Sequence, residues 1–170
     1  MERIILVDDN DDELGYEGKE QCHRGKGMLH RAFSVFIFDG DKMLITQRSG
    51  KKKTWPLYWS NACCSHPRKG EDTAAAAHRR LQEELGFSCS LRFLFKFQYN
   101  ATYDSEWGEH EVDWVFIGTY GGHVKPDPQE IKDYQYVDVA TLEKDVEKHP
   151  DSYTPWFKLI LEKVLESRTG

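Results

Sequence analysis

A cysteine and a histidine lie two residues apart in the segment Cys64-Ser65-His66-Pro67. Proline biases the residue before it towards an extended conformation, so Cys64 and His66 can face the same way. A thiol beside a metal-bound imidazole can have a lowered pKa and act in proton transfer. A buried structural cysteine next to a surface histidine fits these residues equally well. The segment is therefore a candidate for proton transfer and metal binding.

Two carboxylates are spaced alternately in Glu109-His110-Glu111. On a strand, alternate side chains point to the same face, so Glu109 and Glu111 would lie together with His110 opposite. Two carboxylates on one face repel each other unless a cation joins them. A metal ion is one explanation for the pattern, and a solvated strand end is the other.

Two further histidines, His23 and His30, lie in a loop and just before a predicted strand. Either one alone could be incidental. Together with His66, Glu109 and Glu111 they form a set of three nitrogen and two oxygen ligands, which suits Mn²⁺, Zn²⁺ or Mg²⁺. The set predicts about one tightly bound divalent ion per chain.

Charged residues gather in a predicted helix and in a basic loop. Arg80 and Glu84 are one helical turn apart, so they could form a surface salt bridge. Alternatively, Glu84 contacts a second metal while Arg79 or Arg80 supports a phosphate. The basic loop could be a solvated face or, near a metal, a diphosphate site. Its cations are Arg48, Lys51, Lys52 and Lys53.

The composition limits the class of protein. The 170 residues predict one domain, 1–170, and 39% hydrophobic with 31% charged residues is typical of soluble globular proteins. A net charge of −6 argues against nonspecific nucleic-acid binding. No apolar run has the length of a membrane span, and the N-terminus lacks a secretory signal. The four cysteines indicate free thiols. We expect a cytoplasmic monomer without a nucleic-acid or membrane partner.

Apolar patterns and turn residues predict a mixed α/β (α+β) fold. Strands are expected at 4–7, 14–16, 33–38, 43–47, 91–99, 112–120 and 134–139, with a loop around residues 19–24. Helices are expected at 73–85, 141–148 and from Thr154-Pro155 onwards. The first of these helices should begin at Asp72 or Thr73, end at Gly86 and pack on the sheet through Ala74, Ala77, Leu81 and Leu85. Strands pairing mostly with their neighbours in sequence should form a sheet packed between helices.

Several motifs in this order resemble the type I isopentenyl-diphosphate Δ-isomerases over nearly the whole chain. The matching segments are Cys22-His23, Leu29 to Ser34, Asn61 to Pro67, Arg79 to Gly86, Trp107 to Asp113 and Thr154 to Phe157. The resemblance implies a Nudix-like mixed β-sheet sandwich flanked by helices. In that comparison, the predicted helix at 73–85 and the residues before it form a degraded Nudix box. Ser65 replaces the leading glycine of the box, and Arg80 replaces a glutamate. Both differences weaken the alternative of a Nudix hydrolase.

The resemblance also implies roles for individual residues. One divalent metal would be held by His23, His30, His66, Glu109 and Glu111. A Mg²⁺ accompanying the diphosphate would contact Glu84 and the backbone carbonyl of Cys64. The diphosphate would contact Lys19, Arg48, Lys52 and Arg80, with Lys51 and Lys53 as alternatives to Lys52. Tyr99 would assist the glutamate, and Trp156 would lie over the hydrocarbon.

The activity implied is the interconversion of isopentenyl diphosphate and dimethylallyl diphosphate, in isoprenoid precursor biosynthesis. Cys64 and Glu111 would add and remove protons on opposite faces of the substrate, through a tertiary carbocation. Trp156 could stabilise that cation through its ring face. Two other classes remain open at this point. One is a Nudix-type diphosphate hydrolase, and the other is an inactive binding module stabilised by a metal.

Overall fold

The computed structural model of the chain describes residues 2–168. The strands are β1 Arg3–Val7, β2 Glu13–Gly18, β3 His30–Asp39, β4 Lys42–Arg48, β5 Trp59–Ser60, β6 Cys63–Ser65, β7 Leu91–Thr102, β8 Gly108–Thr119 and β9 Ile131–Asp138. The helices are α1 Lys19–Cys22, α2 Thr73–Leu85, α3 Val139–Lys148 and α4 Pro155–Arg168, with a 3₁₀ turn at Pro150–Ser152. Each described helix is too short or too polar to cross a bilayer.

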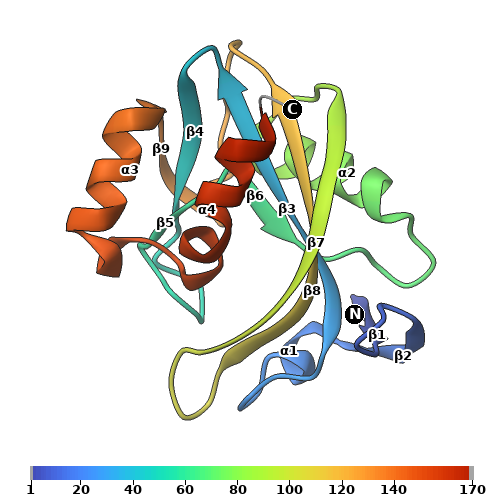
Figure 1. Cartoon of the computed structure of the whole chain (residues 1–170). Coiled ribbons are helices and arrows are strands. Elements are labelled where there is room, and N and C mark those ends of the chain that lie inside the picture. The colour runs from blue at the N-terminus through green and yellow to red at the C-terminus, as the bar shows by residue number, and fades with distance from the viewer. Residues whose placement is uncertain (1, 169–170) are drawn as a thin grey trace.

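Strand β3 lies in the middle of a mixed sheet (Figure 1). It pairs in parallel with β8 along its length, and β8 pairs antiparallel with β7. On its other side, β3 pairs with β6 near its start and with β4 near its end. Strand β4 continues the sheet to β9, while the β1–β2 hairpin joins the start of β3. Strands from distant parts of the sequence are thereby brought together.

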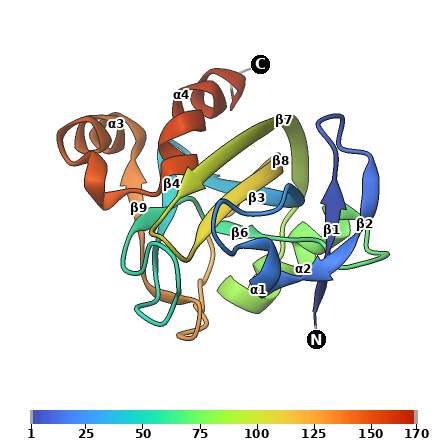
Figure 2. The same ribbon diagram turned by 90° about the horizontal axis from the view of Figure 1, so that it is seen from below.

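Helices α2 and α4 cover opposite faces of this sheet (Figures 1 and 2). On β3, Phe33, Val35 and Ile37 belong to the core beneath α2, whereas Phe36 and Phe38 belong to the core beneath α4. A strand buried on both faces reads as a continuous apolar run, as β3 does from Val35 to Phe38. Helix α4 contributes Phe157, Ile160, Leu161 and Val164 to the core that it covers. Its Trp156 belongs instead to a smaller cluster with Trp55 and Tyr99.

Local signals set the ends of α2 as the sequence indicates. Asp72 accepts a hydrogen bond from the backbone N–H of Ala75 at 3.0 Å, which caps the helix start. Gly86 ends the helix with φ of +73°, a conformation that glycine adopts without strain. Ala76 contributes to the buried face although it was not predicted, and Ala74 is only partly buried.

Three expectations differ from the structure. Residues 19–22 form a short helix instead of a loop, since a single turn is too short to show an apolar period. Strands β7 and β8 extend to Thr102 and begin at Gly108, so the hairpin is longer than expected. The expectation that strands pair with their neighbours in sequence fails in two places, because β3 pairs with β8 and β4 pairs with β9. Apolar patterns do not specify the partner of a strand.

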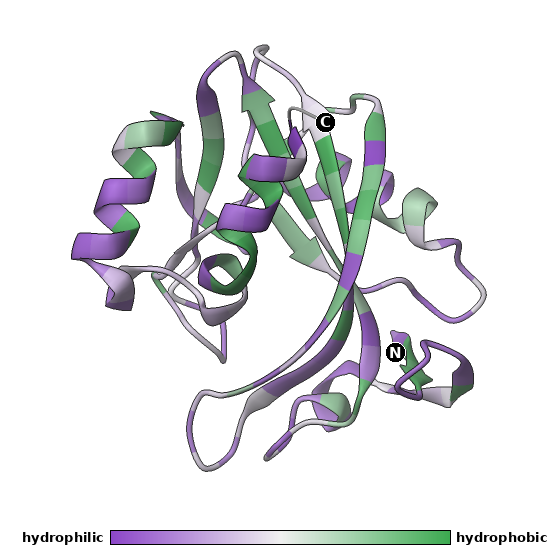
Figure 3. Cartoon of the chain, in the orientation of Figure 1, coloured by the Kyte–Doolittle hydropathy of each residue, from purple (hydrophilic) through white to green (hydrophobic). Residues whose placement is uncertain are grey.

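Hydropathy divides the long β7–β8 hairpin into two parts (Figure 3). The half that crosses the sheet is hydrophobic and contributes Val115, Phe116 and Ile117 to the cores. The half nearer the hairpin turn is mostly hydrophilic and carries Glu109 and Glu111, which are buried nonetheless. Buried acidic side chains require partners, so this end of the hairpin is where the chemistry is expected.

Candidate active site and metal centre

Three histidines and two glutamates from separate elements form one buried cluster. His23 follows α1, His30 begins β3, His66 follows β6, and Glu109 and Glu111 lie on β8. One ligand atom from each lies within 4.8 Å of every other, and all five residues are buried. The structure therefore brings together the five residues expected to share a metal ion.

Strand pairing explains why these residues meet. In the parallel pair of β3 and β8, His30 lies opposite Glu111. In the antiparallel pair of β7 and β8, Tyr99 lies opposite Glu111. Glu109 and Glu111 share a face because side chains alternate along a strand, and His110 between them is only half-buried.

Hydrogen bonds to the backbone fix the orientation of two of the histidine rings. Nδ1 of His23 lies 2.6 Å from the carbonyl oxygen of Lys19, and Nδ1 of His30 lies 2.7 Å from that of Met28. A carbonyl oxygen only accepts, so each Nδ1 carries a proton. In the neutral ring, Nε2 then presents a lone pair towards the centre of the cluster, as a metal-binding histidine does.

The nitrogen lone pairs face carboxylate oxygens. Nε2 of His23 lies 2.8 Å from Oε2 of Glu109, and Nε2 of His30 and of His66 each lies 2.9 Å from Oε2 of Glu111. Oε2 of Glu109 is buried and has no hydrogen-bond partner among the described residues, although Nε2 of His23 lies close to it. Lone pairs that converge around an unsatisfied oxygen fit a divalent cation bound between them.

The protonation states agree with metal binding. Burial, followed by the charges of His30 and His23, holds the pKa of His66 well below its usual value. Burial alone would raise the pKa of Glu111, but hydrogen bonding and charge from His30 lower it. Burial alone would lower the pKa of His23, but Glu109 and Glu111 raise it. A neutral His66 and an ionised Glu111 are in the forms that bind a metal, and His23 would lose its proton on binding.

The Cys64 thiol is held by three polar neighbours. Its sulfur donates to Oδ1 of Asn61 at 3.1 Å and accepts from Nε1 of Trp156 at 3.2 Å. The hydroxyl of Ser34 lies 3.6 Å away. The amide of Asn61 cannot flip freely, because its Nδ2 donates to two backbone carbonyl oxygens at 3.0 Å. The sulfur is therefore oriented by groups that are themselves fixed.

Cys64 and Glu111 differ in protonation state. Burial, with a further contribution from Asp113, raises the pKa of Cys64 to about 12, so the sulfur keeps its proton at neutral pH. Glu111 is ionised, and the Tyr99 hydroxyl donates a hydrogen bond to its Oε1. Burial raises the pKa of Tyr99 well above its usual value, so that hydroxyl also stays protonated. One protonated and one unprotonated group are what a reaction that adds one proton and removes another requires.

One cavity of about 510 Å³ holds both groups, a volume in the range of small-molecule sites. Cys64, Tyr99, Glu111 and Trp156 all contribute to its wall. The same wall carries five basic side chains, those of Lys19, Arg48, Lys51, Lys52 and Lys53. A protonated thiol, an ionised carboxylate and five cations in one cavity suit a small anionic molecule.

The consecutive lysines in the cavity wall have different partners. Nζ of Lys52 lies 2.6 Å from Oε2 of Glu130, and Lys52 is half-buried. Nζ of Lys53 lies 3.3 Å from Glu20 and 4.7 Å from the ring centre of Trp107. Lys52 is therefore the lysine that is paired with Glu130, whereas Lys53 contacts Glu20 and Trp107.

Arg48 is held in place by the loop that follows it. Its Nε and Nη2 donate to the backbone carbonyl oxygen of Thr54 at 3.2 and 2.9 Å, and Nε also donates to that of Trp55 at 3.1 Å. Its guanidinium lies 5.3 Å from the ring centre of Trp156. These contacts fix a positive charge in the cavity wall.

Arg80 and Glu84 form the ion pair that the sequence allowed, with Nη2 of Arg80 3.0 Å from Oε2 of Glu84. The same oxygen accepts from the thiol of Cys63 at 3.2 Å. Neither Arg80 nor Glu84 lines the large cavity. Glu84 instead lines a small adjoining pocket of about 30 Å³, whose wall includes Arg48, Lys52, Cys64 and Glu130. Glu84 is thus next to the cavity rather than in it.

Several residues around the site had no role predicted from the sequence. The Ser34 hydroxyl donates to Oδ2 of Asp113 at 2.7 Å, and the buried Oδ1 of Asp113 has no partner among the described residues. Burial, with the charge of Glu111 next, raises the pKa of Asp113 well above its usual value. Asp113 continues the alternation of Glu109 and Glu111 along the strand, so its position on the same face could have been predicted from the sequence. Glu130 has no comparable signal.

Comparison with known proteins first identifies the class. The NUDIX domain family model matches residues 28–157. A crystal structure from Deinococcus radiodurans has a TM-score of 0.76 at 18% identity, and the match covers 95% of this chain and 98% of that chain. The fold is therefore a Nudix fold, as predicted from the sequence.

Two relatives then specify the family. The isopentenyl-diphosphate Delta-isomerase 1 of Aromatoleum aromaticum is 44% identical over 168 residues, which cover 98% of this chain and 94% of the relative. The protein of the same name from Bos taurus is 41% identical over 187 aligned positions, which cover 96% of this chain and 82% of the relative. The chain belongs to the isopentenyl-diphosphate Delta-isomerase family within the Nudix class, which confirms the resemblance seen in its motifs.

Proposed function

We propose that the protein interconverts isopentenyl diphosphate and dimethylallyl diphosphate, and so supplies isoprenoid precursors. The observation that carries this proposal is that Cys64 and Glu111, in opposite protonation states, line one cavity with five cations. The names of the relatives support the same reaction. We further propose that the chain acts as a single domain, 1–170, and as a cytoplasmic monomer without a nucleic-acid or membrane partner.

The reaction moves a double bond by one carbon without breaking the bond to the diphosphate. A proton adds to the terminal methylene carbon, which leaves a positive charge on the neighbouring tertiary carbon. A proton then leaves the carbon on the other side. An unactivated alkene is a weak base, so the acid must be positioned against it and water must be kept away from the cation.

Cys64 and Glu111 are the proposed proton carriers, and they exchange roles when the reaction runs in reverse. The Cys64 sulfur is oriented by Asn61 Oδ1 and Trp156 Nε1, so it presents a defined direction to the substrate. The Tyr99 hydroxyl contacts Glu111 Oε1 directly and is placed to pass a proton to or from that carboxylate.

Aromatic rings surround the proposed position of the hydrocarbon. Trp156 packs edge-to-face against Trp55 with ring centres 5.4 Å apart, and Tyr99 lies 6.1 Å from Trp156. Such rings exclude water and offer π faces to a carbocation. Trp156 would contribute in two ways, through its ring face to the substrate and through its N–H to the Cys64 sulfur.

We propose two metal sites, the first from the histidine and glutamate cluster and the second from the family resemblance. His23, His30, His66, Glu109 and Glu111 would hold one divalent ion, Mn²⁺, Zn²⁺ or Mg²⁺. When bound, that ion neutralises the paired carboxylates and lowers the pKa of groups attached to it. Glu84 and the backbone carbonyl of Cys64 would contact a Mg²⁺ that arrives with the diphosphate. Lys19, Arg48, Lys52 and Arg80 would hold the diphosphate itself, which orients the alkene between the proton carriers.

The product distinguishes this proposal from its rivals. Incubation with isopentenyl diphosphate, followed by NMR, should show dimethylallyl diphosphate and no released phosphate. Cys64→Ala and Glu111→Gln should each abolish turnover while circular dichroism shows that the fold survives. Phosphate release without a double-bond shift would instead establish a hydrolase. A metal-stabilised binding module would show neither product, and Cys64→Ala would leave its binding unchanged.

A further inference from the structure

Glu130 occupies a fixed place in the turn before β9. Its carbonyl oxygen accepts from the backbone N–H of Ser49 at the end of β4, at 2.9 Å, and its own N–H donates to the carbonyl of Asp127 at 3.0 Å. The N–H of Asp127 in turn donates to the carbonyl of Glu84 near the end of α2, at 2.8 Å. The backbone of Glu130 is therefore tied both to the strand before the basic loop and to the helix that carries Arg80.

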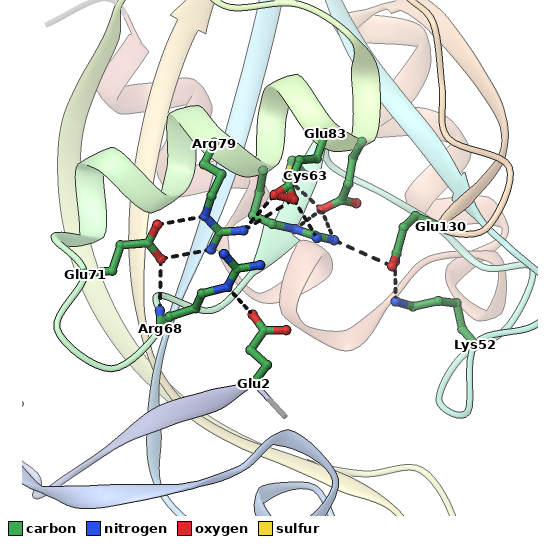
Figure 4. Close-up of polar contacts among 10 residues, drawn as sticks. Glu2, Lys52, Cys63, Arg68, Glu71, Arg79, Glu83 and Glu130 are labelled. Carbon is green, nitrogen blue, oxygen red and sulfur yellow. Dashed lines mark hydrogen bonds and ion pairs between the residues drawn. The ribbon is translucent and has the colours of Figure 1, made fainter.

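The Glu130 side chain lies between two of the cations proposed to hold the diphosphate (Figure 4). Its Oε2 is 2.6 Å from Nζ of Lys52, and its Oε1 is 3.6 Å from Nη2 of Arg80. The side chain is 24% exposed and lines both the large cavity and the small pocket that contains Glu84. A carboxylate thus takes a position among the cations where an incoming phosphate oxygen would be expected.

This placement has an electrostatic consequence. Glu130 and Glu84 put two negative charges beside the cations, so a bare diphosphate meets repulsion as well as attraction. A diphosphate that carries a divalent ion has a smaller negative charge, and its ion is attracted to the carboxylates. We propose that Glu130 is a specificity-determining residue that makes the site select the magnesium complex of the diphosphate over the metal-free anion. This inference rests on the proposed function.

The charge of Glu130 is permanent under working conditions. Burial alone would raise the pKa of Glu130, but the charge of Lys52 and its hydrogen bond lower it to about 2, with Lys19 and Arg80 adding to the effect. The Glu130 carboxylate therefore stays ionised throughout the pH range near neutrality.

The test is the affinity for inorganic pyrophosphate with and without Mg²⁺, measured by isothermal titration calorimetry. The protein is used as purified and without chelator, so that the ion held by the histidine and glutamate cluster stays bound. The measured quantity is the magnesium factor, the dissociation constant without Mg²⁺ divided by that with Mg²⁺. Removing one charge beside the ligand should reduce this factor by roughly ten- to a hundredfold in Glu130→Gln, because metal-free pyrophosphate binds more tightly.

Glu83→Gln is the matched control. Glu83 also contacts Arg80, with Oε2 3.3 Å from Nη1, but it is 39% exposed and lines neither cavity. Its magnesium factor should stay within about threefold of that of the wild type. Glu130→Asp keeps the charge and should also retain the factor. Glu130→Ala is the second neutral variant, and it takes the place of Glu130→Gln if that variant does not fold.

A neutral variant at position 130 with a wild-type magnesium factor would overturn the inference. So would an equal loss in Glu130→Asp and Glu130→Gln, which would show that the shape of the side chain matters rather than its charge. These outcomes are separable from failure of the proposed function, because pyrophosphate binding does not depend on isomerisation. A wild-type protein that does not bind pyrophosphate in the presence of Mg²⁺ would count against both.

Discussion

The hydrogen bond from Trp156 to the Cys64 sulfur gives the most quantitative prediction. Trp156→Phe keeps an aromatic face in the cavity but removes the Nε1–H that lies 3.2 Å from Sγ. Trp156 is only 3% exposed, so water cannot readily replace the donor. A hydrogen bond to an ionised partner contributes about 1.5–3 kcal/mol. At about 1.36 kcal/mol per factor of ten, the expected loss in kcat is roughly ten- to 150-fold.

The loss should appear in kcat and not in KM. The sulfur gains negative charge as it gives up its proton, so the hydrogen bond strengthens during the reaction rather than on binding. The diphosphate contacts involve other residues, and KM should change by less than about threefold. Steady-state kinetics on isopentenyl diphosphate measure both constants.

Trp55→Phe is the control for altered packing. Trp55 is 5% exposed and contacts the Trp156 ring edge-to-face at 5.4 Å, but it makes no hydrogen bond to the Cys64 sulfur. The Trp55→Phe variant should lose about as much stability as Trp156→Phe, but it should retain most of the wild-type kcat. Equal kcat values for Trp156→Phe and Trp55→Phe would refute the role given to the N–H group.

Two further predictions concern the metal and the second cysteine. Removing the divalent ion with a chelator should lower the melting temperature by roughly 5–15 °C, and adding the ion back should restore it, because the five buried ligands are then left facing one another. An unchanged melting temperature after complete metal removal, verified by elemental analysis, would contradict the assigned cluster. Cys63→Ala removes a buried core sulfur and its hydrogen bond to Glu84, so it should cost about 1–2 kcal/mol in the free energy of unfolding. It should keep most of its turnover in the product assay, whereas loss of turnover as complete as in Cys64→Ala would give Cys63 a catalytic part.

The elements predicted most accurately are those with local signals. Helix α2 carries its own cap at Asp72 and its own terminator at Gly86, so its bounds could be read from the sequence. The shared face of Glu109 and Glu111 follows from strand alternation alone. The one-turn helix at 19–22 has no period to detect, and for that reason it was taken for a loop.

The assembly of the site depends on contacts that local patterns do not encode. His30 meets Glu111 because β3 pairs in parallel with β8, 81 residues further along the chain. From the residues alone, each histidine could have been incidental, and the grouping of all five ligands was only one interpretation until the family resemblance supported it. Glu130 shows the same limit more strongly, since its partners Lys52 and Arg80 come from a loop and a helix that the sequence does not connect to it.

Turnover of isopentenyl diphosphate in D₂O, followed by NMR, tests the central claim most directly. If Cys64 and Glu111 exchange protons with the substrate and solvent, the dimethylallyl diphosphate formed should carry solvent deuterium in the methyl group that derives from the terminal methylene. Cys64→Ala should form no such product. A double-bond shift without deuterium incorporation would mean that hydrogen moves within the substrate, and it would contradict the assignment of both proton carriers.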